Sequence, residues 1–368
     1  MRAIFSPERS RPSRWGASRR RSTASLTPAC SSAILPGYDM EDAFHISAYL
    51  DPDRQASGLA FGVSADENLP RGAGDGALMA FDFRFCASGS NDRIPFARPQ
   101  GYDGRRYDLQ RRWYKSEETI GLSYDLTDVF APSLTLGGES DVNSTANFST
   151  DIVGFGRNFG RSWVEADWTT RQAMLRAARD YTQGLLYFLG HDPDVPALVR
   201  DEMATWGLCS GEFLDNGYWP RQIYVREGRR LVGPYVFTEN DILNHVEPPD
   251  SIGLGFYPLD SHVTTRANVG GFVMDEGKLP DSAVGDPYQI PMRVLYGGVY
   301  DNLLAAVGVS ASRTAFLSLR VEPTLMVLGQ AAGALASTAI VERTSVQNAS
   351  YAAVQAALAK AGQVLSTD

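Results

Sequence analysis

The sequence lacks several patterns that identify common metal proteins and hydrolases. Its cysteines are Cys30, Cys86 and Cys209, and no CxxC pair occurs, so neither a zinc ribbon nor a cysteine-ligated iron–sulfur cluster has a ligand set. No HExxH spacing links the histidines, and no GxSxG nucleophile motif is present. No metal site is therefore expected. The odd, scattered cysteines predict free thiols in a reducing, cytoplasmic compartment and not a disulfide framework.

Long apolar runs and a basic body are also missing. No run of about 18 apolar residues occurs, so no membrane partner is expected. The net charge is −9, although the first 30 residues carry seven arginines and a single acid, Glu8. The remaining chain is therefore strongly acidic, which argues against nucleic acid as a partner because phosphate binding requires basic surfaces. A small-molecule substrate is the expected partner.

The first 35 residues are rich in Arg, Ser and Pro and show neither helical nor strand periodicity. They lack the apolar segment of a secretory signal. We predict a disordered basic tail that does not belong to the fold. An organelle transit peptide and a nucleic-acid-binding tail are the alternatives that such a composition leaves open.

Periodicity predicts both helices and strands in the body of the chain. Phe81, Phe83 and Phe85 alternate with Asp82 and Arg84, as in a half-buried strand over 77–86. Apolar residues at helical spacing predict a helix over 169–189. Other expected elements are helices over 105–113, from 196, over 322–340 and over 351–361, paired strands over 223–226 and 231–237, an extended segment over 288–296, and a buried strand over 303–309.

One group of motifs resembles a known bacterial family. The most specific are SLRVEP at 318–323 and MVLGQAAG at 326–333, and the others are FDFRFC at 81–86, PQGYD at 99–103, DNGYWP at 215–220 and YVREGRR at 224–230. Together they resemble the FAD-dependent oxidoreductases related to the flavin subunit of heterodisulfide reductase. The resemblance extends from about residue 37 to about residue 365 and implies FAD as the cofactor.

The segment before the 322–340 helix resembles the closing FAD motif of this family. A strand, a polar loop and a helix start would direct unpaired N–H groups and a positive dipole toward the flavin. The helix is expected to begin with Glu322 at the cap and Pro323 at its first position, and Gly329 and Gly333 to share one face. The resemblance implies that the flavin-side residues are Ser310, Ser312, Arg320, Glu322, Met326 and Gln330. A local cap and ion pair is the alternative for Arg320 and Glu322.

Two residues carry the expected catalytic chemistry. His262, in Asp260-Ser-His262, is the candidate for substrate acid–base work, because histidine exchanges protons near neutral pH. Arg313 stands where the resemblance leads us to expect histidine. It could stabilise charge on a reduced flavin but could not exchange a proton, because arginine stays protonated. A structural role for His262 remains open.

The dinucleotide-binding unit is the part of the family pattern that is not found. FAD binding of this type requires a strand, Gly-x-Gly-x-x-Gly and a helix. Gly72, Gly74 and Gly76 follow a loop and precede a strand instead. The chain is therefore interpreted as a truncated member. Two alternatives remain: a non-catalytic remnant that does not bind FAD, and a carbohydrate-binding or hydrolytic protein.

The expected fold class is α/β, with an α+β substrate domain inserted in an incomplete FAD/NAD(P)-binding Rossmann-like domain. After the tail, 36–100 would be a partial FAD-binding domain, 101–285 the substrate domain, 286–345 the C-terminal part of the FAD-binding domain and 346–368 a C-terminal helix. The strands at 77–86 and 303–309 would normally pair with neighbours from the missing unit. Self-association through exposed strand edges is therefore expected.

Overall fold

The structure is a computed structural model. It describes residues 46–65, 77–120, 125–135, 139–143, 148–153, 155, 159–278 and 284–367. The predicted basic tail and the three glycines at 72, 74 and 76 lie outside the described residues, so both predictions about them stay predictions.

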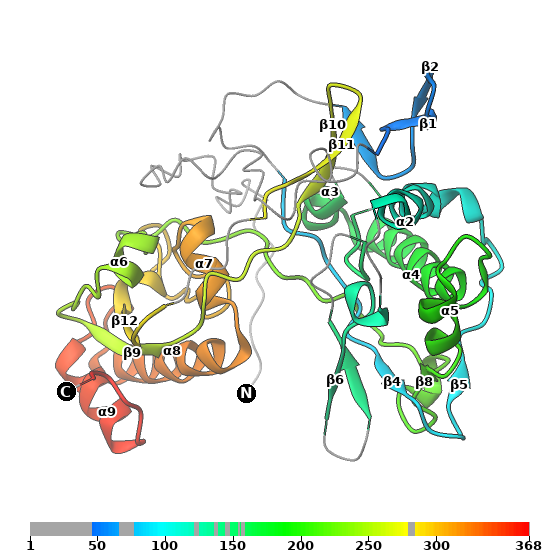
Figure 1. Ribbon diagram of the computed structural model, residues 1–368. Helices are drawn as coiled ribbons and strands as arrows, with labels where there is room; N and C mark the ends of the chain where they lie inside the picture. Colours follow the sequence, from blue (N-terminus) through cyan, green and yellow to red (C-terminus); the bar gives the residue numbers. More distant parts are fainter. Residues whose placement is uncertain are drawn as a thin grey trace. The chain divides into compact units, whose positions relative to one another are not determined.

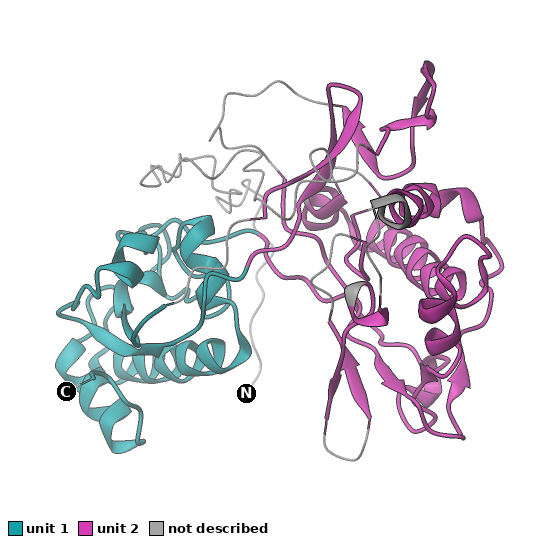
Figure 2. Ribbon diagram, viewed as in Figure 1, with its two compact units in different colours: residues 1–25, 229–260, 282–368 teal, residues 26–228, 261–281 magenta. Residues whose placement is uncertain are grey.

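Contacts divide the chain into two compact units, which Figure 2 colours separately. The described residues of unit 1 fall in 229–260 and 284–367, and those of unit 2 fall in 46–228 and 261–278. The chain thus leaves unit 2 at residue 228 and returns at 261. The two units are defined by contacts between residues and do not test the predicted domain boundaries, which stay predictions.

A layer of helices forms one side of unit 2 (Figure 1). The longest, α4 (Trp168–His191), begins where the Asp167 carboxylate accepts a hydrogen bond from the Thr170 amide at 2.8 Å. This confirms the helix predicted over 169–189. It packs against α5 (Ala197–Met203) and the 3-10 helix η1 (Gly104–Tyr107), which leads into α2 (Asp108–Ile120). The other helical segments of unit 2 are α3 (Phe159–Glu165), η2 (Leu126–Asp128) and η3 (Leu214–Asn216).

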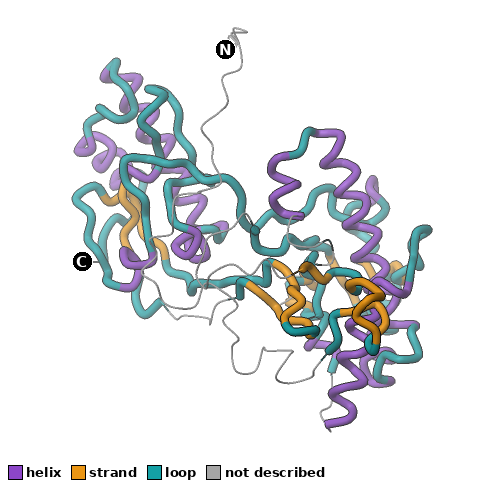
Figure 3. Tube along the Cα trace, turned by 90° about the horizontal axis from the view of Figure 1, so that it is seen from above, coloured by secondary structure: helices purple, strands orange, loops and turns teal. Residues whose placement is uncertain are grey.

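The strands of unit 2 are short and mostly antiparallel. One sheet has the order β5-β8-β4-β7-β6, with β4 (Cys86–Ser88), β5 (Ile94–Pro95), β6 (Pro132–Leu134), β7 (Ser140–Val142) and β8 (Gly207–Leu208). A second has the order β11-β10-β3, and a separate hairpin joins β1 (Tyr49–Asp51) to β2 (Arg54–Leu59). In that second sheet β10 (Thr265–Val269) pairs antiparallel with β11 (Phe272–Glu276) and parallel with β3 (Val63–Ala65). Figure 3 shows how loops separate these short strands.

The segment predicted as a half-buried strand is buried at Asp82 as well as at its phenylalanines, while the side chain of Arg84 is 35% exposed. Phe81, Phe83 and Phe85 are buried in the aromatic core, where Phe85 stacks on Trp219 with ring centroids 5.0 Å apart. Asp82, on the opposite side, is 0% exposed. The expectation of a solvent-facing polar side was therefore wrong at Asp82, because Arg226 lies against its carboxylate and allows it to be buried.

Cys86 and Cys209 form a disulfide, which corrects the prediction of free thiols. The cysteines are 123 residues apart, yet β4 and β8 pair so that they stand opposite each other with Cα atoms 5.4 Å apart. Spacing along the chain could not reveal this pairing, which depends on the sheet register. The disulfide removes the argument for a reducing compartment, because disulfides are rare in reducing compartments. The cytoplasmic location stays a prediction.

Unit 1 packs helices against a two-stranded sheet (Figure 1). Strand β9 (Ser251–Gly255) pairs antiparallel with β12 (Tyr288–Pro291), and α8 (Glu322–Glu342) and α9 (Tyr351–Lys360) contact β9. The remaining helices are α6 (Glu239–Leu243), η4 (Met292–Val294) and α7 (Arg313–Leu319). The predicted helices over 322–340 and 351–361 are confirmed.

Three finer expectations about unit 1 and its border were wrong. Residues 303–309 form only an isolated bridge at Leu304, and Val307 is 60% exposed, so no buried strand runs there. Residues 223–226 and 231–237 do not pair, because Tyr224 bridges Asp82 and Phe237 bridges Ala311. Helix α8 has Val321 at its N-cap, so that Glu322 is its first residue.

Helix α8 is long and apolar. Over its most apolar 18 residues the mean hydropathy is 1.6, enough by length and composition to cross a membrane, and 28% of that stretch is buried. A core helix of a soluble protein meets the same criteria, so the length and composition of α8 are weak evidence for a membrane span.

Helices and strands are mixed in the described chain, as the predicted α/β class requires.

Candidate functional site

Three segments of unit 2 lie side by side and bring charged residues together. Phe81 bridges Ile152, and Asp82 bridges Tyr224 on the other side. The Tyr224 amide donates to the Asp82 carbonyl at 2.7 Å, and the Ile152 amide to the Phe81 carbonyl at 2.8 Å. Asp151 therefore lies one residue before Ile152, which bridges Phe81. Arg226 lies two residues after Tyr224, which bridges Asp82.

Arg226 connects two buried carboxylates. Its Nη1 lies 2.8 Å from Asp151 Oδ1, and its Nη2 lies 3.5 Å from Asp82 Oδ2. Nη1 also donates to the Ala80 carbonyl at 2.6 Å, and Nη2 to Asn143 Oδ1 at 2.9 Å. The side chains of Arg226 and Asp82 are 0% exposed. A buried charge of this kind persists only when it is paired and hydrogen-bonded.

His262 joins the same group. Its Nδ1 lies 2.7 Å from Asp151 Oδ2, and its side chain is 3% exposed. A carboxylate that accepts from Nδ1–H fixes the neutral ring in the tautomer whose Nε2 carries the lone pair. We call Asp82, Asp151, Arg226 and His262 the acid–base cluster.

The two carboxyls of this cluster have different proton affinities. Burial raises the pKa of Asp82 to about 7, against a lowering effect of Arg226. Burial also acts to raise the pKa of Asp151, but Arg226 and His262 outweigh it and lower that pKa below its ordinary value. Asp151 is therefore the ionised partner of His262, while Asp82 exchanges its proton near neutrality. Groups with pKa values separated in this way are characteristic of acid–base sites.

A second buried ion pair lies in the same unit. Arg266 and Asp275 are register partners on β10 and β11, with Nε 3.2 Å from Oδ1 and side chains 5% and 6% exposed. Burial raises the pKa of Asp275 to about 6 despite this partner. Arg266 also lies over the ring of Phe148, 4.4 Å from its centroid. This pair ties two strands together and is assigned no chemistry.

The two serines predicted beside the flavin have protein partners in unit 1. Ser310 Oγ donates to the Tyr235 carbonyl at 2.6 Å and accepts from the Gly233 amide at 2.9 Å. Ser312 Oγ caps α7 by accepting from the Ala315 amide at 3.1 Å and lies 3.2 Å from a Glu239 oxygen. Both hydroxyls therefore hold the loop before α7 in place.

The two predicted arginines stand at opposite ends of α7. Arg313 is its first residue and is half-buried. Arg320 is its C-cap residue, and its Nη2 contacts Asp260 Oδ2 at 2.7 Å and the Asp260 carbonyl at 3.2 Å. Arg320 is thus held by Asp260, two positions before His262 in the sequence.

Glu322, Met326 and Gln330 are spaced four residues apart and lie exposed along one face of α8. Met326 is 74% exposed. Gly329 and Gly333 are also exposed, and no atom lies within 4 Å of where a Cβ would stand on either. We call the surface formed by Met326, Gly329, Gln330 and Gly333 the α8 face. These four residues are exposed and uncharged, and the two glycines leave room for a planar ring.

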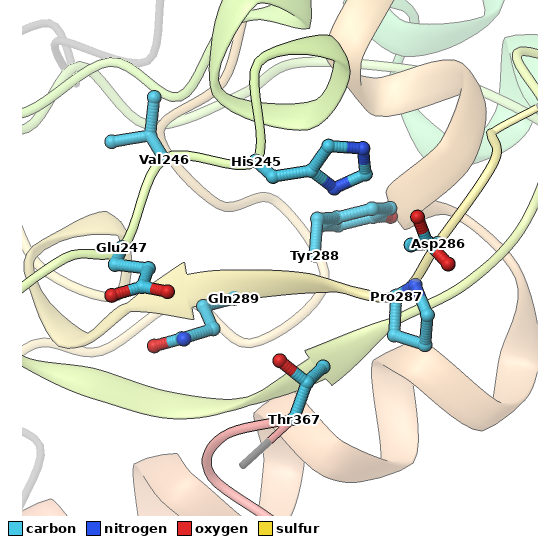
Figure 4. Close-up of a pocket in the computed structure, with 8 residues that line it drawn as sticks. All are labelled: His245, Val246, Glu247, Asp286, Pro287, Tyr288, Gln289 and Thr367. Atoms are coloured by element: carbon cyan, nitrogen blue, oxygen red, sulfur yellow. The ribbon is translucent and has the colours of Figure 1, made fainter.

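Unit 1 also contains an open pocket of about 310 Å³ (Figure 4). Figure 4 shows the ring of His245 beside that of Tyr288, with the Asp286 carboxylate near it. His245 has a φ of 47°, in the left-handed region that strains a side-chain-bearing residue. The other lining residues are Val246, Glu247, Pro287, Gln289 and Thr367. None of the predicted site residues lines this pocket.

Sequence reasoning identified His262 but not its partners. Asp82 had a usable signal, because an acid between two core phenylalanines must be exposed or paired. Arg226 lies in the motif at 224–230, which gave no signal that this arginine is buried, and its exposed fraction is 2%. Asp151 had no sequence signal, because its contact with His262 spans 111 residues.

Comparison with known proteins gives one clear result. The family model described as FAD dependent oxidoreductase matches residues 12–358. No curated protein and no solved structure matches the chain. The family match does not support the carbohydrate-binding or hydrolytic alternative.

Proposed function

Because the chain belongs to the FAD-dependent oxidoreductase family, we propose that it oxidises a small hydroxyl-bearing substrate and that His262 takes the substrate proton. The single observation that carries this proposal is the buried contact of His262 Nδ1 with Asp151 at 2.7 Å. Bound FAD would supply the acceptor for the hydride that leaves the C–H bond. Removal of that hydride from an alcohol also requires a base for the O–H proton.

The acid–base cluster suits this role. Asp151 orients the imidazole and stabilises the cation that forms when Nε2 accepts a proton. Arg226 keeps Asp151 ionised, because its guanidinium contacts the same carboxylate. Asp82, whose pKa burial raises to about 7, holds a proton for part of the time and limits the net negative charge. When Asp82 is ionised, the two carboxylates balance the charges of Arg226 and of the imidazolium that forms when His262 accepts a proton.

The described residues fit one part of the cofactor. The α8 face offers exposed space for the flavin ring at Gly329 and Gly333, and Met326 and Gln330 would contact the ring. Ser310, Ser312 and Arg320 would act indirectly, by fixing the loop and helix that lead to α8. For Arg313, we propose stabilisation of negative charge at the flavin. We assign no ligand for the pyrophosphate among the described residues.

The finer family assignment also belongs to the proposal. The motifs at 318–333 support a relationship to the heterodisulfide-reductase flavin subunit and a Rossmann-like FAD domain of which this chain holds the C-terminal part. A protein that binds no flavin would be the non-catalytic remnant. Self-association through strand edges stays part of this proposal.

The direct test is flavin retention. The purified chain is mixed with FAD, freed of unbound cofactor by gel filtration, and examined for protein-bound visible flavin bands. We expect bound FAD in the wild type and its loss in Gly333→Leu, which adds a bulky side chain to the α8 face at a position where a Cβ would meet no atom within 4 Å. Glu342→Leu, at the exposed end of the same helix, should keep it. A wild type without flavin bands would establish the remnant alternative.

The role of His262 is tested in the flavin-loaded protein. Anaerobic bleaching of the flavin is followed with a panel of sugars and polyols. His262→Gln should slow bleaching by about 10²- to 10⁴-fold while flavin content is unchanged. Asp151→Asn should slow it as well, because the amide no longer selects the tautomer. Equal rates in wild type and His262→Gln would assign His262 a structural role.

A further inference from the structure

Two strand pairings place three metal-binding side chains on one face of the five-stranded sheet in unit 2. Cys86 and Cys209 are opposite each other on adjacent strands, and the Cys209 amide donates to the Cys86 carbonyl at 3.1 Å. On the other side of β4, Cys86 is the register partner of Asp141. Glu139 precedes Asp141 by two residues, so its side chain points to the same face of the sheet.

The three ligand atoms lie within reach of one ion. The sulfurs of Cys86 and Cys209 and a carboxylate oxygen of Glu139 all lie within 4.8 Å of one another. The Glu139 backbone is fixed, because its carbonyl accepts from the Thr135 amide at 2.7 Å and hydroxyl at 2.8 Å. Cys86 and Glu139 are half-buried, which leaves a route for a reductant and an ion. The three ligands thus come from β4 (Cys86), the residue after β8 (Cys209) and the residue before β7 (Glu139).

We propose that the reduced form of this protein binds one zinc-like divalent cation through Cys86, Cys209 and Glu139. Thiolates favour soft or borderline cations such as Zn²⁺, and a carboxylate with one water completes a tetrahedral set. The disulfide and the ion are alternative states of the same two sulfurs. A dithiol reduces the bond, becomes a disulfide itself and leaves two Cys thiols. The cation then displaces their protons to solvent.

The neighbouring charges permit such an ion. Arg84, two residues before Cys86, forms an ion pair with Asp141. The guanidinium also lies over the ring of Tyr224, 5.1 Å from its centroid. Its charge is therefore balanced before the ion arrives. Two thiolates and one carboxylate then give the bound divalent ion a favourable surplus of negative charge.

Cobalt provides a direct probe. The full chain is reduced under nitrogen with a water-soluble phosphine, which takes up oxygen from water to form the phosphine oxide as the disulfide becomes two thiols. After desalting, Co²⁺ is added stepwise. We expect a thiolate-to-cobalt charge-transfer band that saturates at one equivalent and disappears when Zn²⁺ is added. The unreduced chain should show no band.

Variants separate the proposed site from a disulfide with no further role. Cys209→Ser should abolish the band, and Glu139→Gln should weaken Co²⁺ binding about 10- to 100-fold. Glu212→Gln, an exposed carboxylate three positions after Cys209, should bind as the wild type does. Far-ultraviolet circular dichroism checks that each variant is folded. Absence of the band in the reduced wild type, or equal affinity in Glu139→Gln, would overturn the proposal. Flavin is not needed, so the result does not depend on the proposed oxidoreductase activity.

Discussion

Arg226 in unit 2 and Arg320 in unit 1 both contact carboxylates, but the two contacts differ in their exposure to water. In unit 2, Arg226 is 0% exposed at its side chain and contacts two carboxylates. In unit 1, Arg320 is 6% exposed and contacts Asp260, whose side chain is 26% exposed. Water can therefore compensate Asp260 if its partner is lost, whereas Asp82 and Asp151 have no such access. The difference shows that the acid–base cluster, unlike the Arg320–Asp260 pair, requires its charges to be balanced within the protein.

This contrast bears on function as well as stability. The acid–base cluster has pKa values shifted in opposite directions, which an ordinary surface ion pair does not produce. The predicted flavin-side residues Ser310, Ser312 and Arg320 are held by other protein groups, and Glu322, Met326 and Gln330 are exposed on α8. Unit 2 therefore carries the stronger chemical argument, and unit 1 depends more on the family match.

The largest expected effect is at Arg226. Arg226→Met removes the cation and leaves Asp82 and Asp151 buried without it, which should destabilise the protein by about 3–5 kcal/mol. Urea denaturation followed by circular dichroism measures this loss. The control is Arg221→Met, because Arg221 pairs with Asp215 while their side chains are 66% and 63% exposed. The control should cost less than about 1 kcal/mol. Equal losses in the two variants would remove the contrast between buried and exposed pairs.

A smaller effect is expected at Arg320. Arg320→Met removes the hydrogen bonds to Asp260, and the loss should be about 1–3 kcal/mol, because Asp260 regains water. The same denaturation experiment gives this value beside that of Arg226→Met. A loss at Arg320 as large as that at Arg226 would show that unit 1 also depends on a fully desolvated pair.

The free energy of unfolding should also depend on pH through Asp82. Asp82 has a folded pKa of about 7 against an ordinary value of 3.8, so the folded protein holds a proton that the unfolded chain releases. Its contribution to stability is complete below the ordinary pKa and is lost as pH rises toward 7. Relative to Asp82→Asn, wild-type stability should fall by up to about 1.4 kcal/mol per pH unit in that window.

Parallel denaturation series between these pH values test this expectation. The difference between the two proteins isolates Asp82, because Asp275, whose pKa burial raises to about 6, is present in both. Profiles that stay parallel from acid to neutral pH would show that Asp82 remains ionised in the folded chain. The acid–base cluster would then carry one net negative charge throughout this pH range while His262 is neutral.

Local patterns predicted the regular helices well and the charged contacts poorly. The α4 and α8 helices follow from periodicity and end signals that lie within each segment. The contact of Asp151 with His262 and the Cys86–Cys209 pair depend on strand register across more than 100 residues. The alternation around Asp82 indicated an extended segment, but it could not show that Arg226 would cover the polar side. Val307, in an apolar run, is exposed because that run pairs at only one residue.

The smallest expected effect on stability is on the α8 face. Met326 is 74% exposed, so Met326→Gln should change the free energy of unfolding by less than about 0.5 kcal/mol. The same change should reduce FAD retention, because a polar side chain would replace the apolar contact proposed for the flavin. Ile340→Gln is the matched control, since Ile340 is 75% exposed on the same helix and has no proposed contact. Equal FAD retention in the two variants would remove Met326 from the proposed flavin surface, whereas a loss confined to Met326→Gln would give unit 1 a function that its stability does not reveal.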